Sequence, residues 1–151
     1  MENNLENKIN APAEAPSILV ADDDESVRTF IKSALNKYFS SYVVQEVKSG
    51  KELLENATQT KYHLIITDND MEKKNIGVET IRALRANNML APVIIMSGRD
   101  SNEIRKYLDS PAGQTNISFL PKPTPLSLIL SEANKYLNRQ QEYGEQNGTN
   151  K

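Results

Sequence analysis

Residues 63–70 read HLIITDND, an apolar run that ends in closely spaced acids. Short runs of this kind, rich in Ile and Val, are typical of buried strands. Four similar runs occur along the chain: Ser17–Ala21 (SILVA), Tyr42–Val47 (YVVQEV), Pro92–Met96 (PVIIM) and Ile117–Leu120 (ISFL). The sequence therefore predicts five strands, with His63–Thr67 as the third.

The segments between these runs carry apolar residues at helical spacing. Five amphipathic stretches are predicted, around residues 27–35, 53–57, 78–84, 104–108 and 126–137. Strands that alternate with helices in this way form a parallel sheet covered on both faces. We therefore expect an α/β protein with a doubly wound, five-stranded parallel sheet and five helices.

Length and composition favour a single globular domain. The chain has 151 residues, of which 25% are charged and 38% hydrophobic, within the range of one domain. The polar ends predict a disordered leader over 1–16 and a frayed polar tail over 139–151, which leaves a domain over 17–138.

Charge, cysteine content and apolar runs exclude several classes of protein. The net charge of −2 gives no sign of a nucleic-acid-binding surface, and the absence of Cys excludes disulfides and thiol catalysis. No apolar run approaches the ~20 residues that cross a bilayer, and residues 1–10 do not resemble a signal peptide. We expect a cytoplasmic protein that contacts neither membrane nor nucleic acid.

Polar residues follow four of the five predicted strands. Asp22 and Asp23 follow the first strand, Asp68 the third, Ser97 the fourth and Lys122 the fifth. In an open parallel sheet the carboxyl ends of the strands meet at one edge, where functional groups gather. Clustered carboxylates suit Mg²⁺, which commonly bridges such groups to a phosphate, while a Lys ammonium pairs with phosphate oxygens. A carboxylate that attacks phosphorus is an established nucleophile.

Each of these residues also has an ordinary structural interpretation. The acidic run can begin a helix, Asp68 can cap one, Ser97 can lie in a plain turn, and Lys122 can be a surface residue. Their shared position at strand ends favours one common site over four unrelated roles. The lone histidine, His63, is expected at the opposite edge of the sheet as an ordinary, partly exposed residue.

Four segments together resemble the receiver domain of two-component response regulators, and the stand-alone chemotaxis regulator in particular. They are LVADDDESVR (19–28), HLIITDNDM (63–71), VIIMSG (93–98) and FLPKP (119–123). The resemblance covers residues 17–138 and implies the flavodoxin-like fold of that family. It also implies a phosphoacceptor, not a turnover enzyme. The phosphoryl group would come from a sensor histidine kinase or a histidine phosphotransfer protein.

The resemblance assigns the acceptor and the Mg²⁺ ligands. Asp68 corresponds to the phosphoacceptor, Asp22 and Asp23 to the acidic pair that coordinates Mg²⁺, and the backbone carbonyl of Asp70 to a further ligand. Lys122 corresponds to the phosphate-pairing lysine, followed by a cis peptide bond to Pro123.

The resemblance also assigns a switch. Ser97 corresponds to the hydroxyl that moves toward the phosphoryl group, and Phe119 to the aromatic that turns inward on activation. The face formed by the fourth helix, fifth strand and fifth helix would then bind a downstream protein target.

The chain departs from the family pattern after the acceptor. Glu72 replaces the usual Pro and Ile76 the acid before Gly, so we expect the 72–76 loop to be longer and less constrained. The polar stretch 109–116 is expected to enlarge or loosen the target-binding face. Two residues near the site, Asp70 and Arg99, are expected to tune the lifetime of the phosphoaspartate. They could orient or block the hydrolytic water, or pair with each other.

Two alternatives remain at this point. The chain could be a receiver-like module that binds partners without phosphorylation, which the atypical loop favours. It could also be a phosphatase of the haloacid-dehalogenase type, whose nucleophile opens an Asp-x-Asp motif like Asp68-Asn69-Asp70. In that second case the acidic run at Asp22 would have no role.

Overall fold

The computed structural model describes residues 15–108 and 112–149. The strands are β1 (Ser17–Ala21), β2 (Val43–Val47), β3 (Leu64–Asp68), β4 (Val93–Ser97) and β5 (Ile117–Pro121). The helices are α2 (Glu25–Tyr38), α3 (Gly50–Gln59), α4 (Ile76–Ala86), α5 (Ser101–Arg105) and α6 (Leu126–Thr149), and a short 3-10 helix, η1 (Ala112–Gln114), precedes β5. The predicted alternation is confirmed, with strand ends within one residue of those expected.

The five strands form one parallel sheet in the order β2-β1-β3-β4-β5. Every residue of β1, β3 and β4 is buried, while the edge strands β2 and β5 are partly exposed. The strand order reverses direction between β1 and β3, so the carboxyl ends of these two strands form the topological switch point of the sheet.

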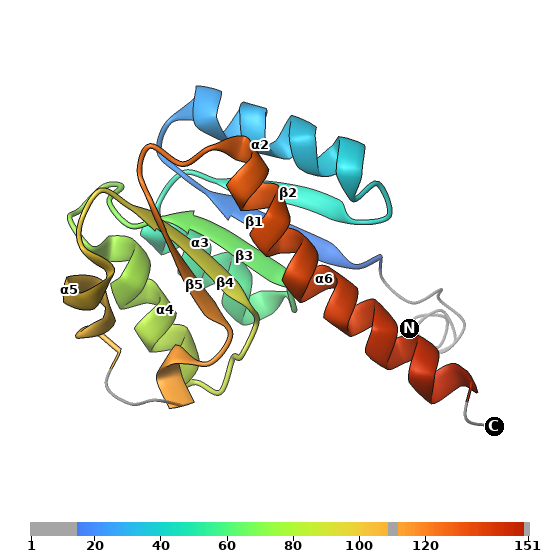
Figure 1. Ribbon diagram of the computed structural model, residues 1–151. Helices are drawn as coiled ribbons and strands as arrows, with labels where there is room; N and C mark the ends of the chain where they lie inside the picture. The colour runs from blue at the N-terminus through green and yellow to red at the C-terminus, as the bar shows by residue number, and fades with distance from the viewer. Residues whose placement is uncertain (1–14, 109–111, 150–151) are drawn as a thin grey trace, which may run out of the picture.

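Helices cover both faces of the sheet (Figure 1). The first core lies under α2 and α6, where Ile31 and Leu35 of α2 and Ile129 and Leu137 of α6 pack on the sheet. The second core lies under α3, α4 and α5 and includes Leu53, Ile81 and Ile104. Two apolar cores on opposite faces confirm the predicted doubly wound α/β fold.

The last helix differs from the prediction in length. α6 continues beyond Asn138, the predicted end of the domain, as far as Thr149, and Figure 1 shows it projecting past the sheet. Gln, Glu and Arg are good helix formers, and no proline interrupts the stretch. The expected frayed tail is therefore helical through Thr149. The predicted leader lies mostly outside the described residues, and the domain boundaries of 17–138 stay predictions.

The fourth helix is short. Asp100 caps α5 by accepting a hydrogen bond from the backbone N–H of Asn102 at 2.7 Å, and the helix ends at Arg105. Ile104 and Leu108, which predicted this helix, are both buried. The polar stretch 109–116 is described only from Ala112, where η1 begins. Within the described residues, no helix has both the length and the apolar character needed to cross a bilayer.

Candidate functional site

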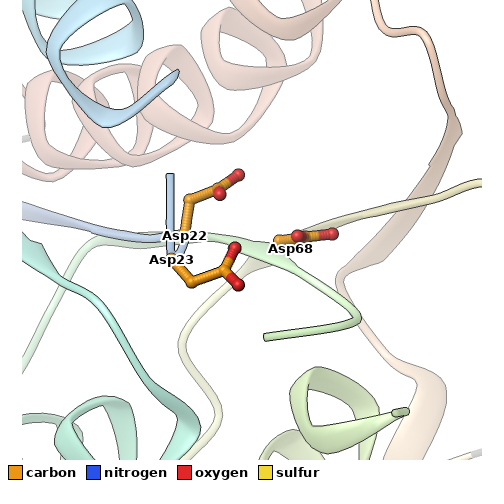
Figure 2. Close-up of side chains that lie close together, drawn as sticks. All are labelled: Asp22, Asp23 and Asp68. Carbon is orange, nitrogen blue, oxygen red and sulfur yellow. The ribbon is translucent and has the colours of Figure 1, made fainter. Parts of the chain in front are cut away.

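Three acidic side chains meet at the switch point of the sheet. Asp22 and Asp23 follow β1 and Asp68 ends β3, and one carboxylate oxygen from each lies within 4.8 Å of the others. Figure 2 shows the three side chains gathered at neighbouring strand ends. Asp22 and Asp68 are buried, whereas Asp23 is exposed. The structure thus brings together the acids that the sequence placed in one site.

Hydrogen bonds on three sides fix the turn after β1. The Asp22 N–H donates to the Val47 carbonyl of β2 at 3.2 Å, and the Asp22 carboxylate accepts from the Asp24 N–H at 2.9 Å. The Arg28 guanidinium of α2 donates to the Asp22 carbonyl at 2.7 Å. Asp24 itself caps α2 by accepting from Ser26. The residues of the acidic run therefore have different roles: Asp24 caps α2, and Asp22 faces the site.

Lys122 reaches the site from the end of β5. Its Nζ lies 2.6 Å from Oδ1 of Asp68, and this ion pair offsets part of the carboxylate charge. The Lys122 N–H also donates to the Ser97 carbonyl at 2.9 Å, which ties β5 to the end of β4. The Lys122–Pro123 peptide bond is cis, as the resemblance to receiver domains implied.

Ser97 ends β4 with its side chain buried. Its hydroxyl oxygen accepts a hydrogen bond from the Arg99 N–H at 3.1 Å. The backbone N–H of Asn69 donates to the Met96 carbonyl at 2.9 Å, so the ends of β3 and β4 are held side by side. The Ser97 hydroxyl therefore lies at the strand end next to the one that carries Asp68.

Burial makes the two inner carboxylates hold protons more tightly than usual. Desolvation raises the pKa of Asp22 to about 6, and the nearby Asp68 charge adds to this. Desolvation likewise raises the pKa of Asp68, although Lys122 opposes that shift. Buried carboxylates that repel one another are stabilised by a hard divalent cation with oxygen ligands. The donor set of Asp22, Asp23 and Asp68 therefore fits Mg²⁺.

The raised pKa of Asp22 predicts that Mg²⁺ binding weakens in acid. Below about pH 6 the Asp22 carboxylate is protonated, so the cation must displace a proton. The affinity should then fall about tenfold for each further pH unit. We expect the Mg²⁺ dissociation constant, measured by calorimetry, to be about ten times higher at pH 5.0 than at pH 7.5. Equal constants at the two pH values would contradict the assignment of Asp22 as a ligand.

A polar network at the rim of the site was not anticipated from the sequence, apart from the pairing of Asp70 with Arg99. The Arg99 guanidinium donates to Oδ2 of Asp70 at 2.7 Å and also to the side-chain oxygen of Asn75. Asn75 in turn contacts Asn69 and Tyr107. Asn75 lies just before α4 and has a left-handed backbone with φ of 63°, which Asn tolerates better than most residues. The tolerance of Asn for this backbone conformation is a sequence signal that could have drawn attention to Asn75.

The loop after the acceptor is anchored, contrary to the expectation that it is less constrained. The Glu72 carboxylate accepts the N–H groups of Gly50 and Lys51 at 2.7 Å and 3.1 Å. These N–H groups belong to the first turn of α3, where a negative charge is favourable. Partial burial raises the pKa of Glu72, but these hydrogen bonds outweigh it and hold the pKa below its usual range. Glu72 thus replaces the rigidity of proline with a contact to α3.

Phe119 lies in β5 and contacts the last residue of α5. It is half-buried in β5, and the Arg105 guanidinium stacks over its ring at 4.3 Å. Phe119, Ser97 and Arg99 line a cavity of about 310 Å³. A second, larger cleft of about 860 Å³ opens onto Asp22, Asp68 and Lys122 and is bordered by Phe30 and Ile129.

His63 precedes β3 at the opposite edge of the sheet, as expected. Its Nδ1 accepts a hydrogen bond from the Ser17 backbone N–H.

Comparison with known proteins identifies the family. The model of the response regulator receiver domain matches residues 18–134. The chain belongs to the response regulator receiver family. The response regulator MprA of Mycolicibacterium vanbaalenii is 31% identical over 123 residues, which cover 81% of this chain and 50% of that protein. The transcriptional regulatory protein PrrA of Mycobacterium leprae is 32% identical over 125 residues, or 83% of this chain and 51% of that protein.

Solved structures agree with this assignment. The receiver domain of the Francisella response regulator 1452 has a TM-score of 0.70 at 29% identity and covers 83% of this chain and 98% of that one. The chemotaxis response regulator CheY4 of Vibrio cholerae has a TM-score of 0.66 at 22% identity, over 82% of this chain and 99% of that one, and shows the same fold.

The family assignment fixes the general function. The chain is a receiver domain of two-component signalling, and a phosphoacceptor role follows from that family. Receiver domains are in general not turnover enzymes. Receiver domains bind Mg²⁺ at an acidic cluster, and the cluster of Asp22, Asp23 and Asp68 is present. The haloacid-dehalogenase alternative finds no support in this match. The chain spans about half the length of the curated relatives that it matches.

Proposed function

We propose that Asp68 is the residue that accepts the phosphoryl group. The observation that carries this proposal is the ion pair between Lys122 and Asp68, at 2.6 Å, beside the Asp22 and Asp23 carboxylates. Lys122 provides one cation beside this carboxylate, and the acidic pair could hold a second, divalent one. Both cations would stabilise the negative charge of an incoming phosphoryl group.

The transfer step forms one bond and breaks another. An Asp68 carboxylate oxygen attacks phosphorus, the P–N bond to the partner's phosphohistidine breaks, and the imidazole leaves with that bond's electron pair. Lys122 then pairs with a phosphoryl oxygen in place of the Asp68 oxygen that it now contacts. The carboxylates of Asp22, Asp23 and Asp68 and the Asp70 carbonyl would hold Mg²⁺, which when bound would neutralise part of the phosphoryl charge. Later attack by water releases inorganic phosphate and restores Asp68.

The switch would begin at Ser97. Its hydroxyl, which accepts from the Arg99 N–H, would turn to donate to a phosphoryl oxygen. Phe119 would then turn toward the space that the Ser97 side chain leaves, since both line the same cavity. The surface of α5, β5 and α6 would change and bind a protein target.

The donor and the cellular setting are proposals of the same kind. Response regulators receive phosphate from histidine kinases, so a sensor histidine kinase or a histidine phosphotransfer protein is the proposed donor for this chain. One relative is named a transcriptional regulatory protein, but this chain matches only about half of it. We propose that the chain is a cytoplasmic module that binds proteins and not nucleic acid.

Labelling with acetyl phosphate tests the proposed function. In the presence of Mg²⁺, we expect one phosphoryl group per chain by intact mass, and borohydride reduction should map it to Asp68. Continuous release of phosphate from a generic phosphomonoester would instead indicate a phosphatase. Absence of any label would indicate a receiver-like module that acts without phosphorylation.

Asp70 and Arg99 are the proposed determinants of phosphoaspartate lifetime. They form an ion pair at 2.7 Å beside the acceptor, and the Asp70 N–H faces Oδ1 of Asp68 at 3.5 Å. Exchanging both residues for Ala should change the dephosphorylation rate about fivefold or more. This is the size of effect typical of residues that interact directly with one another beside a reacting group. A rate equal to that of the unmodified chain would contradict this role.

A further inference from the structure

The Asp70–Arg99 ion pair is too exposed for its own attraction to hold the two side chains in one geometry. The Asp70 side chain is 44% exposed and that of Arg99 is 25% exposed. An ion pair this exposed contributes only about 0–1 kcal/mol by itself, because water competes for both charges. A third residue that bonds to both partners would give the pair a defined geometry.

Asn75 bonds to both partners. Its backbone N–H donates to Oδ1 of Asp70 at 2.7 Å, and its side-chain oxygen accepts from Nη1 of Arg99. Oδ2 of Asp70 accepts from Nη2 of Arg99 at 2.7 Å. The three residues therefore form a closed ring of hydrogen bonds that joins the loop after β3 to the loop after β4.

The rest of the Asn75 side chain is also occupied. Its oxygen accepts a second bond, from Nδ2 of the fully buried Asn69 at 2.9 Å. Its Nδ2 lies 2.7 Å from the hydroxyl of Tyr107, which follows α5. The amide oxygen thus has two donors and the amide nitrogen an acceptor, so the reversed orientation of the amide would break these contacts.

We infer that Asn75 is a positioning residue that sets the lifetime of phosphorylated Asp68 by holding Asp70 and Arg99 together. This inference rests on the proposed function of Asp68. Both carboxylate oxygens of Asp70 are engaged by this ring, one by Asn75 and one by Arg99. These bonds occupy part of the acceptor capacity of the carboxylate and fix the direction in which it points. Release of the ring lets the Asp70 carboxylate turn and orient a hydrolytic water beside Asp68, which speeds dephosphorylation.

The test uses a substitution that spares the backbone. Gly adopts φ near 63° without strain, so Asn75→Gly removes the side chain and keeps the turn. We expect the variant to take up one phosphoryl group from acetyl phosphate and to lose it about fivefold faster, a typical coupling within one network. Tyr107→Phe, which deletes one bond of the network, should speed the loss to a smaller extent. A loss rate unchanged in Asn75→Gly overturns the inference.

A double-mutant cycle separates positioning from general loosening. If Asn75 acts through Arg99, the variant that combines Asn75→Gly with Arg99→Ala should lose phosphate at the rate of Arg99→Ala alone. Independent, multiplying effects would overturn the inference.

A second readout does not depend on phosphorylation. In the unphosphorylated chain, hydrogen exchange at the amide of residue 75 should speed up both in Asn75→Gly and in Arg99→Ala, because the bond to Asp70 loosens. Unchanged exchange overturns the inference. Absence of label in every variant, together with faster hydrogen exchange, would refute the proposed function of Asp68. It would still support the ring of hydrogen bonds among Asp70, Asn75 and Arg99.

Discussion

Asp68→Asn should abolish labelling by acetyl phosphate, with a loss on the order of 10³-fold or more, as is typical when a nucleophile is removed. The amide of Asn occupies the same space as the carboxylate but has no anionic oxygen to attack phosphorus. Asp68 is buried at the end of β3 with Lys122 as its cation, and within the described residues no other carboxylate forms an ion pair with Lys122. The measurement is intact mass after incubation with acetyl phosphate and Mg²⁺.

A matched control separates the loss of the nucleophile from the loss of the fold. Asp70→Asn makes the same chemical change two residues away, on a side chain that is paired with Arg99, and should still accept one phosphoryl group. The Asp68→Asn chain should remain folded, because desolvation raises the pKa of Asp68 and removal of its charge relieves repulsion from Asp22. Label that survives in folded Asp68→Asn would refute the proposed acceptor.

The sequence predicted the fold and the grouping of polar residues at the strand ends because both depend on local patterns. Buried parallel strands are short apolar runs, and their carboxyl ends share one edge of the sheet. These two rules are enough to group the polar residues that follow the strands: Asp22, Asp68, Ser97 and Lys122. All four lie at neighbouring strand ends in the folded chain, and Lys122 pairs directly with Asp68.

The supporting contacts could not be predicted because they join distant segments. Glu72 accepts from the first turn of α3, 22 residues earlier in the chain, and Asn75 contacts Tyr107, 32 residues later. Neither contact has a spacing rule, since each depends on how loops pack after the helices are in place. For the same reason the missing proline suggested a loose loop, whereas Glu72 holds it by charge and hydrogen bonds.

Gly77→Ala should destabilise the protein, although simple helix propensity predicts the opposite. Gly77 lies in the first turn of α4, where Ala is intrinsically better by about 0.5–1 kcal/mol. A Cβ at this position would lie 2.4 Å from the Asp68 carbonyl oxygen and 2.8 Å from the Asn69 Cα. Both are backbone atoms at the end of β3 and cannot move aside alone. We expect the free energy of unfolding in urea to fall by about 1–3 kcal/mol, the usual cost of overpacking.

Gly98→Ala provides the control for this effect. Gly98 follows Ser97 at the neighbouring strand end, a Cβ there meets nothing within 4 Å, and its φ is not positive. Its unfolding free energy should change by less than about 0.5 kcal/mol. The sign of the change in unfolding free energy decides the matter. A Gly77→Ala chain more stable than the original would show that α4 does not pack closely against β3. A loss confined to Gly77→Ala, with weaker Mg²⁺ binding, would show that this close approach sets the position of the Asp68 backbone.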